Sequence, residues 1–189
     1  MGAPPPDPVP TGLVALAEIG DKTQLLSFML AARYKRPWPI CWGILVATAL
    51  NHAMASAVGA WVAGLVAPTT LRWILAVSFV AMAAWMLVPD TLDGDERPAS
   101  GRLGVFGATT LAFFLAEMGD KTQIATVAMA ARFDAFLPVV AGTTLGMMIA
   151  NVPAVILGDR IAHRLPVRAI HATAAVIFVG LAIATVVTG

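Results

Sequence analysis

Two short segments of the chain place carboxylates and a lysine inside apolar sequence. Residues 16–24 read Leu-Ala-Glu-Ile-Gly-Asp-Lys-Thr-Gln, and residues 115–123 read Leu-Ala-Glu-Met-Gly-Asp-Lys-Thr-Gln. We name these the first and the second motif. Together they hold six of the 23 charged residues of the chain. Carboxylates kept in an apolar environment are expensive, and they typically bind cations or relay protons.

The charges of the two motifs do not balance. Each motif carries two acids for one lysine, so the two together carry a net charge of −2. One divalent cation would neutralise this charge, and so would two protons. The composition therefore predicts a site that alternates between a divalent cation and two protons. The acids are Glu18, Asp21, Glu117 and Asp120, and the lysines are Lys22 and Lys121.

A purely structural alternative is a lattice of ion pairs, in which each glutamate pairs with the lysine four residues later in its own motif. That alternative leaves the second acid of each motif unexplained. In a continuous helix, the glutamate and the aspartate of a motif lie three residues apart and share one face. Gly20 and Gly119 separate them, and glycine permits either a close backbone approach or local unwinding of the helix.

Other polar side chains near the motifs are candidates to support the site. In a regular helix, Thr23 and Thr122 would point away from the acids. Further residues could line the path of the ion, although interhelical hydrogen bonding explains them equally well. These residues are Gln24, Ser27, Gln123 and Thr126.

The available donor atoms favour a hard cation. Carboxylate, amide and hydroxyl oxygens suit Ca²⁺, Mn²⁺ or Mg²⁺, whereas zinc and copper sites use histidine or cysteine. Cys41 is the single cysteine of the chain, which excludes an internal disulfide and a cysteine-based metal cluster. His52 and Asn151 lie 99 residues apart, the spacing of the motifs, and both are predicted to flank the site or to serve as hydrogen-bonded structural residues.

The composition identifies an integral membrane protein. Of the 189 residues, 59% are hydrophobic and only 12% are charged, whereas soluble domains have about 25% charged residues. No basic run is present that could bind nucleic acid. Six apolar segments are long enough to cross a hydrocarbon core of about 30 Å at about 1.5 Å per residue. They cover approximately residues 11–33, 38–64, 69–88, 103–132, 136–160 and 166–188.

We therefore predict an all-α integral membrane protein with six transmembrane helices, arranged as two three-helix repeats. The first repeat covers residues 11–88 and the second covers residues 103–188, and a polar linker at residues 89–102 joins them. A metal-binding loop is a weaker interpretation of the acids in this linker. Since each repeat has an odd number of spans, the second must enter the membrane from the opposite side, which gives an inverted repeat.

The basic residues indicate the orientation in the membrane. Apart from the motif lysines, eight lie in the loops after the first, third and fifth segments, and two lie on the other side. This bias predicts that those loops and the linker are cytoplasmic and that both termini face outward. The eight are Arg33, Lys35, Arg36, Arg97, Arg102, Arg160, Arg164 and Arg168, and the two are Arg72 and Arg132.

The paired Glu-x-Gly-Asp-Lys-Thr sequences, each in the first span of a three-span repeat, resemble the Gdt family of cation/proton antiporters, which includes bacterial manganese exporters and transmembrane protein 165. The resemblance covers essentially the whole chain. It implies a compact bacterial inner-membrane antiporter for Mn²⁺ or Ca²⁺, without a tightly bound cofactor. It also implies that Glu18, Asp21, Glu117 and Asp120 form the transport site.

Two other functional classes compete with an antiporter. A cation-selective channel could use rings of acids without coupling the ion to protons. A membrane enzyme could use paired carboxylates, but no nucleophile with its base and no histidine-rich metal set accompanies them. The sequence therefore favours a transporter whose partners are divalent cations, protons and the lipid bilayer.

Overall fold

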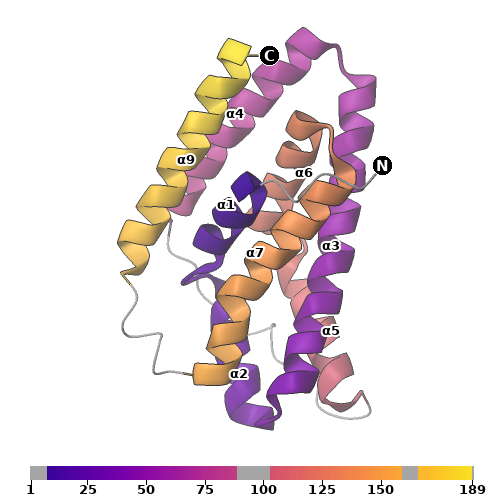
Figure 1. The fold of residues 1–189 in the computed structure, drawn as a ribbon, viewed down its shortest axis with the longest axis vertical. Helices are drawn as coiled ribbons and strands as arrows, with labels where there is room; N and C mark the ends of the chain where they lie inside the picture. The colour runs from indigo at the N-terminus through magenta and orange to yellow at the C-terminus, as the bar shows by residue number, and fades with distance from the viewer. Residues whose placement is uncertain (1–7, 89–102, 159–165, 189) are drawn as a thin grey trace.

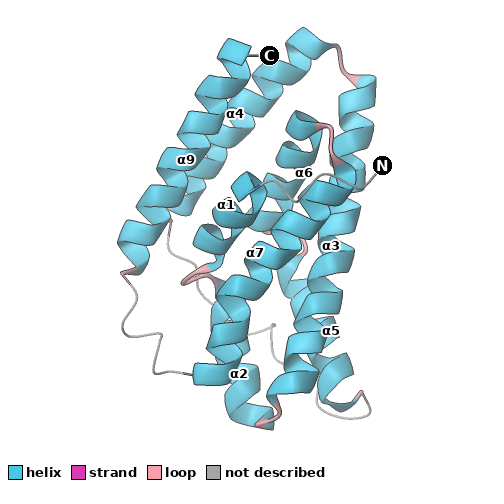
Figure 2. Ribbon diagram, viewed as in Figure 1, coloured by secondary structure: helices cyan, strands magenta, loops and turns pink. Residues whose placement is uncertain are grey.

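The computed structural model describes residues 8–88, 103–158 and 166–188, and every regular element in these ranges is an α-helix (Figure 2). The all-α prediction is thus confirmed. The proposed linker at residues 89–102 lies outside the described residues, as do residues 159–165. The helices are α1 (Pro8–Glu18), α2 (Lys22–Tyr34), α3 (Pro37–Leu65), α4 (Pro68–Met86), α5 (Gly104–Glu117), α6 (Lys121–Phe133), α7 (Phe136–Leu157) and α9 (Val167–Thr188).

The two halves of the chain repeat the same helix pattern at one constant offset of 99 residues. α1 and α5 end at the motif glutamates, and the next three helices of each half begin at matching positions. These starting pairs are Lys22 and Lys121, Pro37 and Phe136, and Pro68 and Val167. The residues after α2 and α6 also match, since Lys35 and Asp134 both have a positive φ, at 52° and 48°.

Four of the six apolar segments form helices that are long and apolar enough to cross a bilayer, namely α3, α4, α7 and α9. For the other two segments, residues 11–33 and 103–132, two alternatives were open at Gly20 and Gly119, a close backbone approach or local unwinding, and the structure shows unwinding. Each is broken at its motif, into α1 and α2 and into α5 and α6. Each break contains a glycine whose backbone has a left-handed conformation, which ends the preceding helix. These glycines are Gly20, at φ 84°, and Gly119, at φ 75°.

The two halves interlock (Figure 1). α3 of the first half packs against α5 and α6 of the second half, and α7 of the second half packs against α1 and α2 of the first. Glycines allow these close approaches. A Cβ on Gly146 would lie 2.5 Å from the carbonyl oxygen of Thr11 in α1, so only glycine fits there.

The last helices of the two halves, α4 and α9, run side by side along one flank of the molecule (Figure 1). Buried aromatic rings join them, with the centroids of Phe79 and Phe178 6.2 Å apart. Their outer surfaces expose large apolar side chains such as Val77, Val176 and Ile183. Apolar side chains directed outward from long apolar helices suit a lipid environment, in which the helices satisfy their own backbone hydrogen bonds.

Candidate cation site

The helix breaks place the motif acids at helix ends. Glu18 is the last residue of α1, and Asp21 is the N-cap of α2, with extended backbone angles. Glu117 and Asp120 occupy the same positions at the end of α5 and the start of α6. The acids of one motif therefore do not share a helix face, as a continuous helix would require. In the second motif, Glu117 and Asp120 nevertheless lie close to each other across the break.

A glutamine side chain hydrogen-bonds to the backbone of each break. The side-chain oxygen of Gln24 accepts a hydrogen bond from the backbone N–H of Gly20 at 2.8 Å, and Gln123 accepts one from Gly119 at the same distance. These contacts satisfy amide groups that a broken helix would otherwise leave without a partner. The matching pair shows that both breaks are built in the same way.

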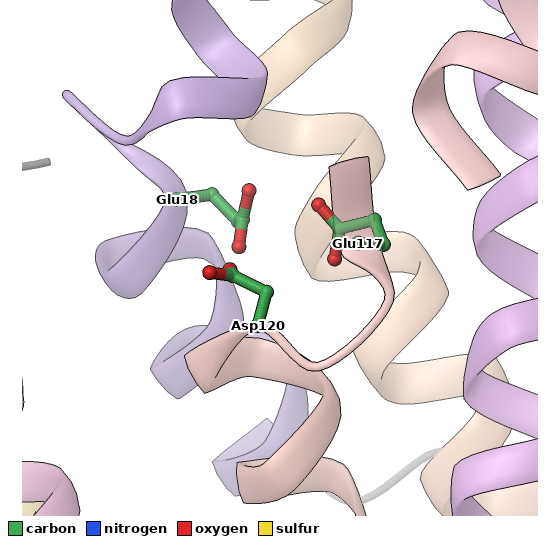
Figure 3. Close-up of side chains that lie close together, drawn as sticks. All are labelled: Glu18, Glu117 and Asp120. Carbon is green, nitrogen blue, oxygen red and sulfur yellow. The ribbon is translucent and has the colours of Figure 1, made fainter. Parts of the chain in front are cut away.

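Carboxylates from the two motifs converge. Glu18, Glu117 and Asp120 each offer an oxygen atom within 4.8 Å of the others, and all three side chains are buried. Figure 3 shows the carboxylate of Glu18 directed from the end of α1 toward Glu117, with Asp120 beside it at the start of α6. Oxygen ligands of Ca²⁺ lie about 2.3–2.6 Å from the ion, so opposite ligands are about 4.6–5.2 Å apart. The three oxygens are therefore close enough together for one such ion to contact all of them.

The motif lysines join the two halves. The Nζ atom of Lys121 lies 3.0 Å from Oδ1 of Asp21, and both side chains are fully buried. The Nζ atom of Lys22 lies 3.4 Å from Oδ1 of Asp120. The structural alternative paired each lysine with the glutamate of its own motif, but these two ion pairs cross from one motif to the other. The helix break is the reason, because it removes the four-residue spacing on which the alternative relied.

Hydroxyl groups from both halves hold Glu18. Thr23 donates to one of its carboxylate oxygens, and Thr122 donates to the other. The expectation that these threonines point away from the acids is wrong, since it assumed a regular helix through the motif. Each threonine instead lies in the first turn of the helix that follows the break. In contrast, neither carboxylate oxygen of Glu117 has a hydrogen-bond partner among the described residues.

The remaining candidates surround the breaks. Ser27 donates to Oδ1 of Asn151 at 2.7 Å, which connects α2 to α7. The Thr126 hydroxyl donates to the carbonyl of Thr122 in its own helix. His52 is fully buried in α3, and neither ring nitrogen has a hydrogen-bond partner within the described ranges.

Two residues that the sequence analysis did not select contact the broken helix pairs. Asn51 accepts from Nε2 of Gln123 at 3.4 Å and donates to the carbonyl of Phe114 at 3.1 Å. His171 lies 2.7 Å from the carbonyl oxygen of Ile19. Asn51 could have been noticed as a second polar residue beside His52, in the middle of an apolar segment. His171 gave no such signal, because it lies near the start of its segment.

The glycines of the breaks permit a direct test. Alanine at φ 84° or 75° costs about 1–2 kcal/mol at either position. At Gly20 the added Cβ would also collide with Val167, whereas at Gly119 it would meet nothing within 4 Å. We expect Gly20→Ala to lower the thermal unfolding temperature of the purified protein in detergent more than Gly119→Ala does.

Gly180→Ala is the matched control, because Gly180 lies in the interior of α9 and a Cβ there would meet nothing within 4 Å. In a helix interior, alanine is more stabilising than glycine by about 0.5–1 kcal/mol. This variant should therefore be as stable as the unmodified protein or slightly more stable. Equal losses at Gly20 and Gly119 would show that Val167 does not restrict the first break.

One family of known proteins matches each half of the fold separately. Apolar spanning helices around buried carboxylates define a membrane transport protein, and the family described as "Divalent cation/proton antiporter GDT1" matches residues 9–94 and again residues 105–189. The chain therefore belongs to the GDT1 family of divalent cation/proton antiporters, which are transporters and not enzymes. The predicted resemblance is confirmed.

Individual relatives agree with this assignment. A Vibrio cholerae protein named "Putative manganese exporter" is 51% identical over 173 residues, covering 91% of this chain and 86% of its own length. The "GDT1-like protein sll0615" of Synechocystis is 31% identical over 175 residues, covering 81% and 82%. An Arabidopsis thaliana "GDT1-like protein 3" is 23% identical over 200 residues, covering 92% and 67%. No solved structure matches the chain.

Proposed function

We propose that this protein exports Mn²⁺, with Ca²⁺ as the second choice, in exchange for protons across the inner membrane of a bacterium. The acids of both motifs form the transport site. The observation that carries this proposal is the convergence of Glu18, Glu117 and Asp120 within 4.8 Å. Asp21 is the fourth acid of the proposed site, and in the present arrangement its carboxylate pairs with Lys121.

The two ion pairs indicate which charges of the proposed site are not balanced by a lysine. Lys22 offsets the charge of Asp120, and Lys121 offsets that of Asp21. The two remaining charges belong to the glutamates, one from each half, and both are buried. Glu18 and Glu117 are therefore the groups that we expect to take up two protons when the cation leaves. Because the cation and the protons would neutralise the same carboxylates, they exclude each other, and this exclusion couples their movements.

The donor set supports Mn²⁺ or Ca²⁺ as the transported ion. The three converging ligands are carboxylates, and hydroxyl oxygens of Thr23 and Thr122 lie against one of them. Such oxygen donors suit hard divalent cations. The relative from Vibrio cholerae is named for manganese export, which favours Mn²⁺ for this chain.

We further propose six membrane crossings in two inverted repeats. α1 with α2 covers residues 8–34, and α5 with α6 covers residues 104–133. Each broken pair holds enough residues for a crossing at about 1.5 Å per residue. Broken helices that meet at a site between inverted repeats are a recurrent design in secondary transporters. The constant offset between the halves supports the repeat.

Reconstitution into proteoliposomes tests the function. An imposed pH gradient should drive Mn²⁺ uptake, and a dye inside the vesicles should report protons leaving as the ion enters. A parallel series with Ca²⁺ and Mg²⁺ ranks the cations. Mn²⁺ flux without any proton countercurrent would instead indicate a cation-selective channel, and no flux of any divalent cation would refute the proposal.

The orientation gives a separate prediction. The bias of basic residues places both termini outside, so a cysteine near the C-terminal end of α9 should react with an impermeant maleimide in intact spheroplasts. Val187→Cys in a Cys41→Ala background suits this test, because Val187 is exposed and Cys41 is the single native cysteine. Arg36→Cys, expected in the cytoplasm, should react only after lysis. The reverse pattern would overturn the proposed orientation.

A further inference from the structure

α9 reaches the break in the first motif through a buried histidine. Nε2 of His171 lies 2.7 Å from the carbonyl oxygen of Ile19, and the side chain is 6% exposed. A carbonyl oxygen can only accept, so Nε2 of the imidazole must carry the hydrogen and donate it. Ile19 directly follows Glu18 and lies between the two helices of the broken pair. The histidine thus holds the backbone beside a carboxylate of the proposed site.

A second contact fixes the same turn. A Cβ on Gly20 would lie about 3.0 Å from Cγ2 of Val167 and closer still to Cγ1, so the valine packs directly on this glycine. Val167 and His171 are one helical turn apart and share a face of α9. α9 therefore holds the first break at two neighbouring points, the carbonyl of Ile19 and the Cα of Gly20.

The second break lacks an equivalent cover among the described residues. A Cβ on Gly119 would meet nothing within 4 Å, and Met118, the counterpart of Ile19, is 54% exposed. The repeat offset pairs His171 with Arg72 of α4. The two halves thus share their helix pattern but differ in whether the last helix of the half covers the break.

We propose that His171 is a positioning residue for cation exchange, which holds the first break so that Glu18 faces the shared carboxylate group. This inference rests on the proposed function. Glu18 receives its hydroxyl donors from Thr23 and Thr122, and it meets Glu117 and Asp120 only while α1 ends where it does. Releasing the carbonyl of Ile19 lets the adjacent carboxylate move, which lowers the population of the arrangement that binds the ion.

The test compares Mn²⁺ transport by four forms of the full chain in proteoliposomes: the unmodified protein, His171→Ala, His171→Gln and Thr173→Ala. In His171→Ala we expect the KM for Mn²⁺ to rise about five- to tenfold, since one buried hydrogen bond is lost. The maximal rate should stay within about twofold. In His171→Gln the side-chain amide can donate to the same carbonyl, so we expect its KM within about twofold of the unmodified protein.

Thr173→Ala is the matched control, because its exposed hydroxyl donates only to the Ala169 carbonyl of its own helix among the described contacts. It should leave both KM and maximal rate unchanged. A merely structural role of His171 would lower the amount of active protein, and hence the maximal rate, without changing KM, and this result would overturn the inference. A raised KM in His171→Gln equal to that in His171→Ala would do the same.

Two features keep the test decisive. If His171→Ala does not survive purification, His171→Asn replaces it, because its shorter side chain places the amide too far from the carbonyl. The unmodified protein separates the two proposals, since the proposed function fails if that protein does not exchange Mn²⁺ for protons. The inference about His171 fails alone if the unmodified protein exchanges and the KM of the His171 variants stays the same.

Discussion

Replacing Glu117 with glutamine is expected to abolish Mn²⁺/proton exchange. The substitution keeps the size of the side chain but removes a charged group of the proposed site and one of the two carboxylates that the lysines do not balance. Changes in groups that merely orient metal ligands typically cost about 10–100-fold. We therefore expect the loss of a ligand to reduce flux by more than about 100-fold. Mn²⁺ uptake and internal pH, recorded together in proteoliposomes, measure this loss.

The variant should still reach the membrane. A charge in the membrane interior costs about 2.5–3.5 kcal/mol on insertion scales, so removing one makes insertion easier. Asp134→Asn is the matched control, because it removes an exposed carboxylate beyond α6, and asparagine accepts the left-handed backbone found there. Asp120→Glu should give an intermediate loss, because the charge remains but shifts by one methylene. Full, proton-coupled Mn²⁺ flux in Glu117→Gln would contradict the proposed role of the motif acids.

The sequence alone was sufficient to predict the repeat, the all-α class and three acids that converge, whereas Asp21, the fourth acid expected in the group, pairs with Lys121. Charges are so scarce in this chain that two matching clusters 99 residues apart could be recognised without a structure. The same offset then appears in the starts of three pairs of helices. Composition and spacing were informative here because every charge in the membrane interior is energetically costly. The few charges that are retained there therefore indicate a function.

The local geometry of the motifs was harder to predict. Spacing rules for a continuous helix paired each glutamate with the lysine of its own motif, but the chain breaks at Gly20 and Gly119, and both lysines pair with an aspartate of the other motif. A glycine followed by aspartate is a helix stop followed by an N-cap, so the break itself left a signal in the sequence. The partner of each lysine left none, because it depends on how the two halves meet.

Among the residues that support the site, the sequence likewise indicated only those close to the motifs. Gln24 and Gln123 were selected because they are the last residues of the motifs, and both hydrogen-bond to the glycine of their own break. Asn51 contacts Phe114, 63 residues away in the sequence, and His171 contacts Ile19, 152 residues away. Only the packing of α3 on α5 and α6, and of α9 on α1, brings them there.

The ion pair between Lys121 and Asp21 is expected to dominate the stability of the site. Both side chains are fully buried and their charged atoms are 3.0 Å apart. Removing one partner of a buried pair leaves an uncompensated charge and typically costs about 3–5 kcal/mol. Lys121→Met should therefore lower the thermal unfolding temperature in detergent strongly. Lys22→Met should have a smaller effect, because Lys22 is 19% exposed and solvent screens its interaction with Asp120.

A double variant tests whether the pair itself causes this loss. Lys121→Met combined with Asp21→Asn removes both charges, so no carboxylate remains uncompensated at Asp21. We expect the double variant to regain most of the stability that Lys121→Met loses, which would be a coupling that independent sites do not show. Additive losses would instead mean that the two residues act separately. Exchange should be absent in the double variant even with its stability restored, because the site would then lack Asp21, one of its four proposed acids.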